Sequence, residues 1–69
     1  PIMAGTMINI NTAMIGDLTQ LPGIGEVMAE RIIDYRTKQG GFKSTEELMK
    51  VKGIGEKKFE KIKEHISVK

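Results

Sequence analysis

The sequence contains no cysteine and no tryptophan, and only 4% of its residues are aromatic. Without cysteine, neither disulfides nor a thiolate zinc site can stabilise this 69-residue chain. No apolar run approaches the ~20 residues of a membrane-spanning helix, and no signal-peptide pattern is visible. The core must therefore come from aliphatic residues and methionine. With 39% hydrophobic and 29% charged residues, this composition favours one small helical domain over a sheet.

Charge is distributed unevenly, although the net charge is only +2. Residues 1–34 carry one basic and four acidic side chains, whereas residues 35–69 carry ten basic and five acidic ones. This asymmetry between the halves predicts a polyanionic partner that contacts chiefly the second half. The alternative interpretation is an ordinary solvated helical surface of mixed charge, which is the commoner explanation of such runs.

Hydrophobic periodicity predicts four helices and no strand, with helices over residues of about 11–20, 26–38, 44–50 and 56–66. Asn11 or Thr12 is the expected N-cap of the first helix. Gly40 is expected to end the second helix, because glycine accepts the left-handed conformation common at helix ends. Ser44 and Glu47 have the spacing of a capping box at the start of the third helix.

A repeat divides the chain into two similar units. The segment LPGIG at residues 21–25 recurs as VKGIG at residues 51–55, and a shift of 30 residues lays residues 18–32 onto 48–62. One such helix-turn-helix unit cannot bury its apolar face alone, so two copies are expected to pack about a pseudo-two-fold axis. The prediction is an all-α fold of four to five short helices.

The expected domain boundaries follow from this repeat. Residues 1–8 show neither period nor cap, so they are expected to form a flexible leader. Residues 9–69 are expected to form one domain with units of about 11–38 and 44–67. Because the chain begins at Pro1 rather than at methionine, we expect a fragment of a longer protein.

Each repeated turn places two glycines around one isoleucine. The six residues are Gly23, Ile24, Gly25, Gly53, Ile54 and Gly55. The isoleucine is expected to point into the core, while the glycines leave the backbone amides accessible at the start of the next helix. Such a group of N–H donors at the positive end of a helix suits a phosphate. A single Gly-x-Gly turn is usually only a compact way to join two helices, but two equivalent copies favour phosphate binding.

Basic side chains surround the second turn. They are Lys52, Lys57, Lys58 and Lys61. Cations near a helix N-terminus oppose the helix dipole, and an anionic ligand would relieve this local cost. The equivalent positions around the first turn include Pro22, Val27 and Met28, so its phosphate contact is expected to use backbone amides alone. The second turn is therefore the predicted main anchor.

Taken in order, the motifs ININTA, LxxLPGIG, AxxIIxYR, GxF and LxxVKGIG resemble the DNA-binding domain of ComEA-type competence proteins, over residues 8–66. The family has a duplicated helix-hairpin-helix fold. The resemblance implies sequence-independent binding of double-stranded DNA through backbone phosphates, with each hairpin donating amides to one strand across the minor groove. It also implies a DNA receptor for uptake, in an extracytoplasmic protein that is anchored through an N-terminal segment. Gly16 departs from the family pattern, which usually has a helix-forming polar residue there.

Two other roles remain open, namely a protein-interaction or structural module with the same fold and a DNA-binding module of a repair protein. His65 is the only histidine, and no nucleophile, base and orienting group come together in the sequence. We therefore expect a binding protein that has no enzymatic activity, metal site, cofactor or small-molecule substrate, and whose isolated domain is monomeric. Hairpins of the family sometimes hold a monovalent cation on their carbonyl groups.

Overall fold

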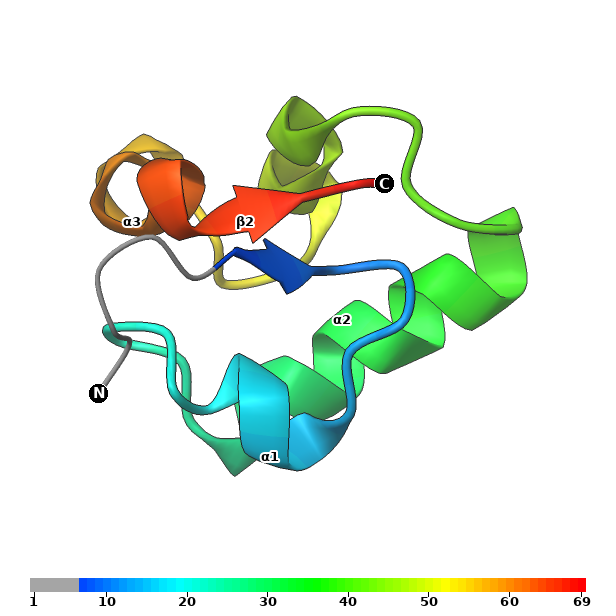
Figure 1. Cartoon of the computed structure of the whole chain (residues 1–69), viewed down its shortest axis with the longest axis horizontal. Coiled ribbons are helices and arrows are strands. Elements are labelled where there is room, and N and C mark those ends of the chain that lie inside the picture. Colours follow the sequence, from blue (N-terminus) through cyan, green and yellow to red (C-terminus); the bar gives the residue numbers. More distant parts are fainter. Residues whose placement is uncertain (1–6) are drawn as a thin grey trace.

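Helices account for most of residues 7–69, the part of the chain that the computed structural model describes (Figure 1). The α-helices are α1 (Ile15–Leu18), α2 (Glu26–Gln39) and α3 (Glu56–Ile62), and the 3₁₀ helices are η1 (Thr45–Lys50) and η2 (Lys63–His65). Two short strands, β1 (Ile8–Asn9) and β2 (Ile66–Ser67), lie side by side. The predicted helical fold is thus confirmed in its main features.

The longest helix, α2, follows the sequence prediction within one residue at its C-terminal end. Its buried positions include Ala29 and Ile32, which lie on one face. Arg36 and Lys38 lie in the last turn, where cations complement the helix dipole. The helix ends because Gly40 takes the left-handed conformation, with φ of 77°.

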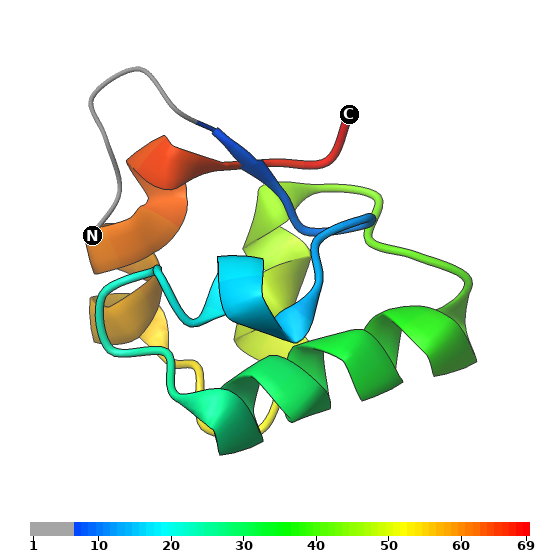
Figure 2. The ribbon, with the colours of Figure 1, turned by 60° about the horizontal axis from the view of Figure 1, so that its bottom comes forward.

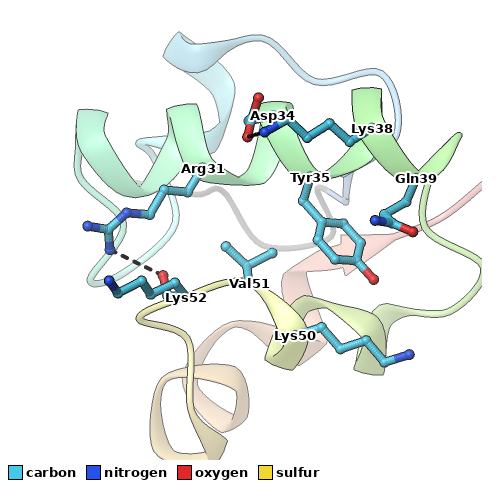
Figure 3. A pocket seen from close by; sticks show the side chains of 8 residues that line it. All are labelled: Arg31, Asp34, Tyr35, Lys38, Gln39, Lys50, Val51 and Lys52. Atoms are coloured by element: carbon cyan, nitrogen blue, oxygen red, sulfur yellow. Dashed lines mark hydrogen bonds and ion pairs between the residues drawn. The ribbon is translucent and has the colours of Figure 1, made fainter.

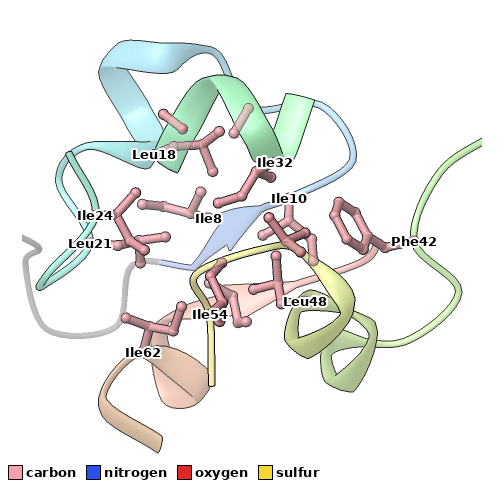
Figure 4. Close-up of a cluster of buried hydrophobic side chains, with 14 of the residues drawn as sticks. Ile8, Ile10, Leu18, Leu21, Ile24, Ile32, Phe42, Leu48, Ile54 and Ile62 are labelled. Atoms are coloured by element: carbon pink, nitrogen blue, oxygen red, sulfur yellow. The ribbon is translucent and has the colours of Figure 1, made fainter. Parts of the chain in front are cut away.

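A single hydrophobic core fills the space between α1, α2, η1 and α3 (Figure 4). Its most completely enclosed side chains are Ile10, Leu18, Leu21, Ile32, Leu48 and Ile62. The central isoleucines of the two turns, Ile24 and Ile54, are buried as the sequence predicted, and Phe42 is buried as well. Among residues 7–69, no polar or charged residue is buried. The core therefore consists of apolar side chains that span both repeated units.

The prediction of no strand is wrong. β1 and β2 form a parallel pair in which Ile8 lies opposite Ile66, and the N–H of Ile10 donates to the Ser67 carbonyl at 2.9 Å. Ile8 and Ile66 are both buried, so the pairing satisfies the backbone of two segments that enter the core. Ile8, which the sequence assigned to the leader, belongs to this pair. Residues 1–6 of the predicted leader lie outside the described residues.

The first helix begins later than predicted, and Asn11 is not its cap. The Asn11 amide instead donates to the carbonyls of Phe42 (2.9 Å) and Val68 (3.2 Å), and its oxygen accepts the N–H of Phe42 at 2.6 Å. α1 starts only at Ile15, where the Asp17 carboxylate accepts the N–H of Met14 at 3.0 Å. Asn11 therefore connects three distant segments, because its amide both donates and accepts.

The predicted capping box at Ser44 does not form. Ser44 makes no side-chain cap to η1, and the Glu47 carboxylate accepts hydrogen bonds from the Lys43 N–H (2.7 Å) and the Tyr35 hydroxyl (2.9 Å). The Lys43 bond, followed by the Tyr35 bond, holds the pKa of Glu47 below its ordinary value. The Tyr35 ring also stacks on Phe42, with centroids 4.9 Å apart. These contacts fasten η1 and the preceding connector to α2.

The last predicted helix is shorter than expected. α3 ends at Ile62, η2 follows, and Ile66 lies in β2 instead of in a helix. Phe59, Ile62 and Ile66 are nevertheless all buried. Pairing with β1 extends the backbone at Ile66 while its side chain stays in the core.

Candidate nucleic-acid interface

The two Gly-Ile-Gly turns lie on the same side of the domain, at the N-terminal ends of α2 and α3 (Figure 2). They have matching backbone conformations. The first glycine takes positive φ in both, +77° at Gly23 and +97° at Gly53, a region that residues with a side chain rarely adopt. The second glycine is the extended N-cap, with φ of −93° at Gly25 and −99° at Gly55. The repeat in the sequence is therefore also a repeat in local structure.

The interior of each turn is held by the same hydrogen bonds. The N–H of Ile24 donates to the Leu21 carbonyl at 3.1 Å, and that of Ile54 donates to the Val51 carbonyl at 3.0 Å. Both isoleucine side chains point into the core. This packing directs the glycines outward, so Gly23, Gly25, Gly53 and Gly55 are all exposed.

Neither backbone strain nor crowding within residues 7–69 requires glycine at the second position of each turn. A Cβ built on Gly25 or Gly55 would meet no atom within 4 Å, and their φ values suit any residue. Serine, asparagine and aspartate are favoured at this N-cap position somewhat more than glycine, because their side chains cap the helix. Glycine at both positions keeps the space above the first helical amides clear, as the close approach of an external group would require.

Charged side chains cross from each unit to the opposite turn. The Lys58 ammonium lies 3.3 Å from the Gly23 carbonyl, and Arg31 Nη1 lies 3.2 Å from the Lys52 carbonyl. The first turn therefore does not present backbone amides alone, contrary to the sequence-based expectation. Arg31 was not among the predicted site residues, although the repeat aligns it with Lys61 and could have indicated its role.

The crossing contacts are reciprocal. Met28 lies over Gly53, where its Cε is 2.7 Å from the position that a Cβ would occupy. Lys58, which is equivalent to Met28 under the 30-residue shift, lies over Gly23, with its Cε 3.9 Å from the corresponding position. Each unit thus places the same helical position against the turn of the other unit.

The other predicted site lysines project into solvent. Lys52, Lys57 and Lys61 are exposed. The ion pairs found among residues 7–69 are Lys38 with Asp34 and Lys63 with Glu60, so none uses a predicted site lysine. Lys52 lies within the second turn and Lys57 in the first turn of α3, whereas Lys61 lies in the last turn of that helix. The phosphate contacts predicted for these lysines stay a prediction.

Residues 7–69 hold no group of three or more histidine, aspartate or glutamate side chains arranged to bind a metal ion. None of the helices described combines the length and the apolar character needed to cross a membrane.

Comparison with known proteins places this geometry in a family. Residues 4–67 match the model of the helix-hairpin-helix motif. Over 94% of its length, the chain is 51% identical to ComE operon protein 1 of Bacillus subtilis, of which it covers 32%. This similarity confirms the predicted resemblance to ComEA-type domains.

Other relatives extend the comparison. The chain is 44% identical over 88% of its length to the human endonuclease/exonuclease/phosphatase family domain-containing protein 1, of which it covers 11%. It is 40% identical over 96% of its length to an uncharacterized protein of Haemophilus influenzae, of which it covers 60%. The chain spans about a third of the Bacillus relative and less of the human one. With its two glycine turns and its match over residues 4–67, the chain belongs to the helix-hairpin-helix motif family.

Proposed function

We propose that this domain binds double-stranded DNA without sequence preference, through phosphates of the DNA backbone. The observation that carries the proposal is the open space above Gly25 and Gly55, where neither crowding within residues 7–69 nor backbone strain requires glycine. A phosphate oxygen must come within about 3 Å of a backbone N–H to accept a hydrogen bond. A side chain at the N-cap would obstruct that approach, whereas glycine leaves it free.

The two turns would contact the two strands of one duplex across the minor groove. The proposal includes an approximate two-fold relation between the units. It is supported by the reciprocal placement of Met28 over Gly53 and of Lys58 over Gly23. Reciprocal contacts between equivalent positions are typical of two-fold interfaces. Because the two strands of DNA are also related by two-fold symmetry, equivalent turns would meet equivalent phosphates.

Exposed cations would supply the electrostatic part of binding. Lys52, Lys57 and Lys61 would contact phosphates near the second turn, and Lys58 would contribute a cation at the first. Neutralising phosphates releases condensed counterions, which drives association at low salt. Since amides and lysines recognise phosphate and not base edges, this surface should not distinguish sequences.

The proposed biological role is that of the DNA receptor domain of a protein for DNA uptake. Support comes from 51% identity to ComE operon protein 1. The role includes an extracytoplasmic location, and membrane anchoring would come from other parts of the intact protein. We propose a binding function without catalysis or a small-molecule substrate, and a monomeric isolated domain that needs no cofactor. We also propose that the turn carbonyls can hold a monovalent cation. Replacing potassium by lithium in the binding buffer would test this proposal.

Salt-titrated fluorescence anisotropy with labelled duplexes tests the function. Dissociation constants for random and A·T-rich duplexes of equal length should agree within a few-fold. Near physiological salt they should lie on the order of 10⁻⁴ to 10⁻⁶ M, with a slope of log K against log[salt] of about −3. A strong preference for one sequence would contradict backbone recognition. A flat salt response would favour a protein-docking module instead.

A further inference from the structure

A concave, basic pocket lies beside the second turn, on the side away from the first turn (Figure 3). It has a volume of about 250 Å³. One wall comes from α2 and the other from the end of η1 and the start of the second turn. The side chains that matter for its charge are Arg31, Asp34, Lys38, Lys50 and Lys52.

Positive charge predominates in this pocket. Four of the lining side chains are cationic and one is anionic, which leaves an excess of three positive charges. Asp34 is paired with Lys38 at 3.1 Å, so the excess belongs to Arg31, Lys50 and Lys52. Glu47 lies near Lys50, but its oxygens already accept hydrogen bonds from Lys43 and Tyr35. The pocket is therefore suited to an anion.

The pocket is continuous with the second turn. Lys52 belongs to both, and Arg31 joins the pocket wall to the turn by donating to the Lys52 carbonyl at 3.2 Å. Val51, between the two lysines, is buried and forms an apolar floor. A polyanion seated on the turn would thus meet further cations without leaving the surface.

We infer that this pocket receives a further backbone phosphate of the duplex, beyond the phosphates that the two turns contact. The inference rests on the proposed function and extends the DNA-contacting surface along α2 to Lys50. Each strand of a DNA duplex presents one phosphate for about every 3.4 Å of the helix axis. The longest dimension of the domain is 31 Å, so a strand crossing the turn would present several phosphates along this face. A DNA strand already seated on the second turn reaches this pocket through Lys52, which belongs to both, whereas an acidic peptide would have to bind the pocket on its own.

The test compares Lys50→Ala with Lys43→Ala, a matched loss of one exposed lysine that does not line the pocket. Each variant is titrated with a duplex at several salt concentrations, and its melting temperature is measured. For Lys50→Ala we expect a salt slope shallower by about 0.9, the value for one lost phosphate contact. Its affinity at low salt should fall several-fold, whereas Lys43→Ala should stay near wild type.

A gain of affinity gives an independent test. Asp34 lies in the pocket and repels phosphate, so Asp34→Asn should strengthen DNA binding a few-fold more than Glu64→Gln, which removes an exposed carboxylate elsewhere. The Asp34–Lys38 pair is largely exposed, so its loss should scarcely affect folding.

Several results would overturn the inference. If wild type binds DNA but Lys50→Ala and Lys43→Ala behave alike, the pocket takes no phosphate and the proposed function stands. If Lys50→Ala weakens binding to poly-glutamate but leaves DNA binding unchanged, the pocket recognises an acidic protein segment. If wild type shows no salt-dependent DNA binding at all, both proposals fail together.

Discussion

Replacing the N-cap glycine of each turn by alanine should separate DNA binding from folding. At Gly25 and Gly55 an added methyl group meets no atom within 4 Å and the backbone is unstrained. Alanine is a poorer N-cap than glycine by roughly 0.5–1 kcal/mol. Alanine also restricts the unfolded chain more than glycine does, which raises the free energy of unfolding by about 0.4–1 kcal/mol. The stability of each variant should therefore stay within about 0.5 kcal/mol of wild type.

The effect on DNA binding should be much larger. The methyl group would occupy the space through which a phosphate reaches the amides at the start of α2 or α3. A hydrogen bond to a charged group contributes about 1.5–3 kcal/mol, so its loss corresponds to roughly ten- to one-hundred-fold weaker binding. Fluorescence anisotropy with a labelled duplex measures this change, and thermal unfolding measured by circular dichroism checks the fold.

Two other glycines provide the controls. Gly16→Ala adds a methyl group to exposed open space in α1, so it should raise stability by up to about 1 kcal/mol and leave DNA binding unchanged. Gly53→Ala should instead cost about 1–3 kcal/mol, because Gly53 has φ of +97° and lies against Met28. If Gly25→Ala and Gly55→Ala both melt normally and bind DNA as tightly as wild type, phosphates do not approach these amides.

Three further predictions concern the fold and the charged surface. Asn11→Ala should lower the free energy of unfolding by about 2–3 kcal/mol, because three hydrogen bonds are lost. Urea unfolding measures this change, and a loss below about 1 kcal/mol would contradict the structural role of Asn11. The pKa of Glu47 is lowered chiefly by the Lys43 N–H, so the stability from this carboxylate is complete above its ordinary pKa of 4.5 and is lost as the pH falls through the lower folded-state value. Glu47→Gln should therefore reduce the loss of stability between neutral and acid pH, and an unchanged pH profile would contradict this. Lys57→Ala should make the salt slope of DNA binding shallower by about 0.9, whereas Val27→Ala at the equivalent position should leave the slope unchanged. If Val27→Ala changed the slope more than Lys57→Ala does, the second turn would not be the main anchor.

Patterns confined to short stretches of the sequence were sufficient for much of the fold. The bounds of α2 followed from its apolar spacing and from Gly40, and the two turns followed from the repeat. These features depend on residues a few positions apart, so backbone preferences and helical periodicity express them directly. The burial of Ile24 and Ile54 was predicted in the same way.

Predictions failed where one residue interacts with a distant part of the chain. Asn11 has the chemistry of an N-cap, but its amide binds Phe42 and Val68 instead. Glu47 stands at capping-box spacing, yet it accepts from the Lys43 N–H, one residue before the expected cap, and from the distant Tyr35 hydroxyl. In both residues the polar group can bond to more than one partner. The sequence does not indicate which of these partners the packing of the chain brings close enough to bond.

The sequence by itself determined that this chain has two equivalent Gly-Ile-Gly turns, with lysines around the second. Only the tertiary structure decided which charges lie at which turn, because Lys58 reaches the first turn and Arg31 the second. The pairing of β1 with β2 was likewise decided by tertiary structure, since two-residue strands have no periodicity of their own. Local conformation follows from neighbouring residues, whereas the placement of a long charged side chain depends on how the two units pack against each other.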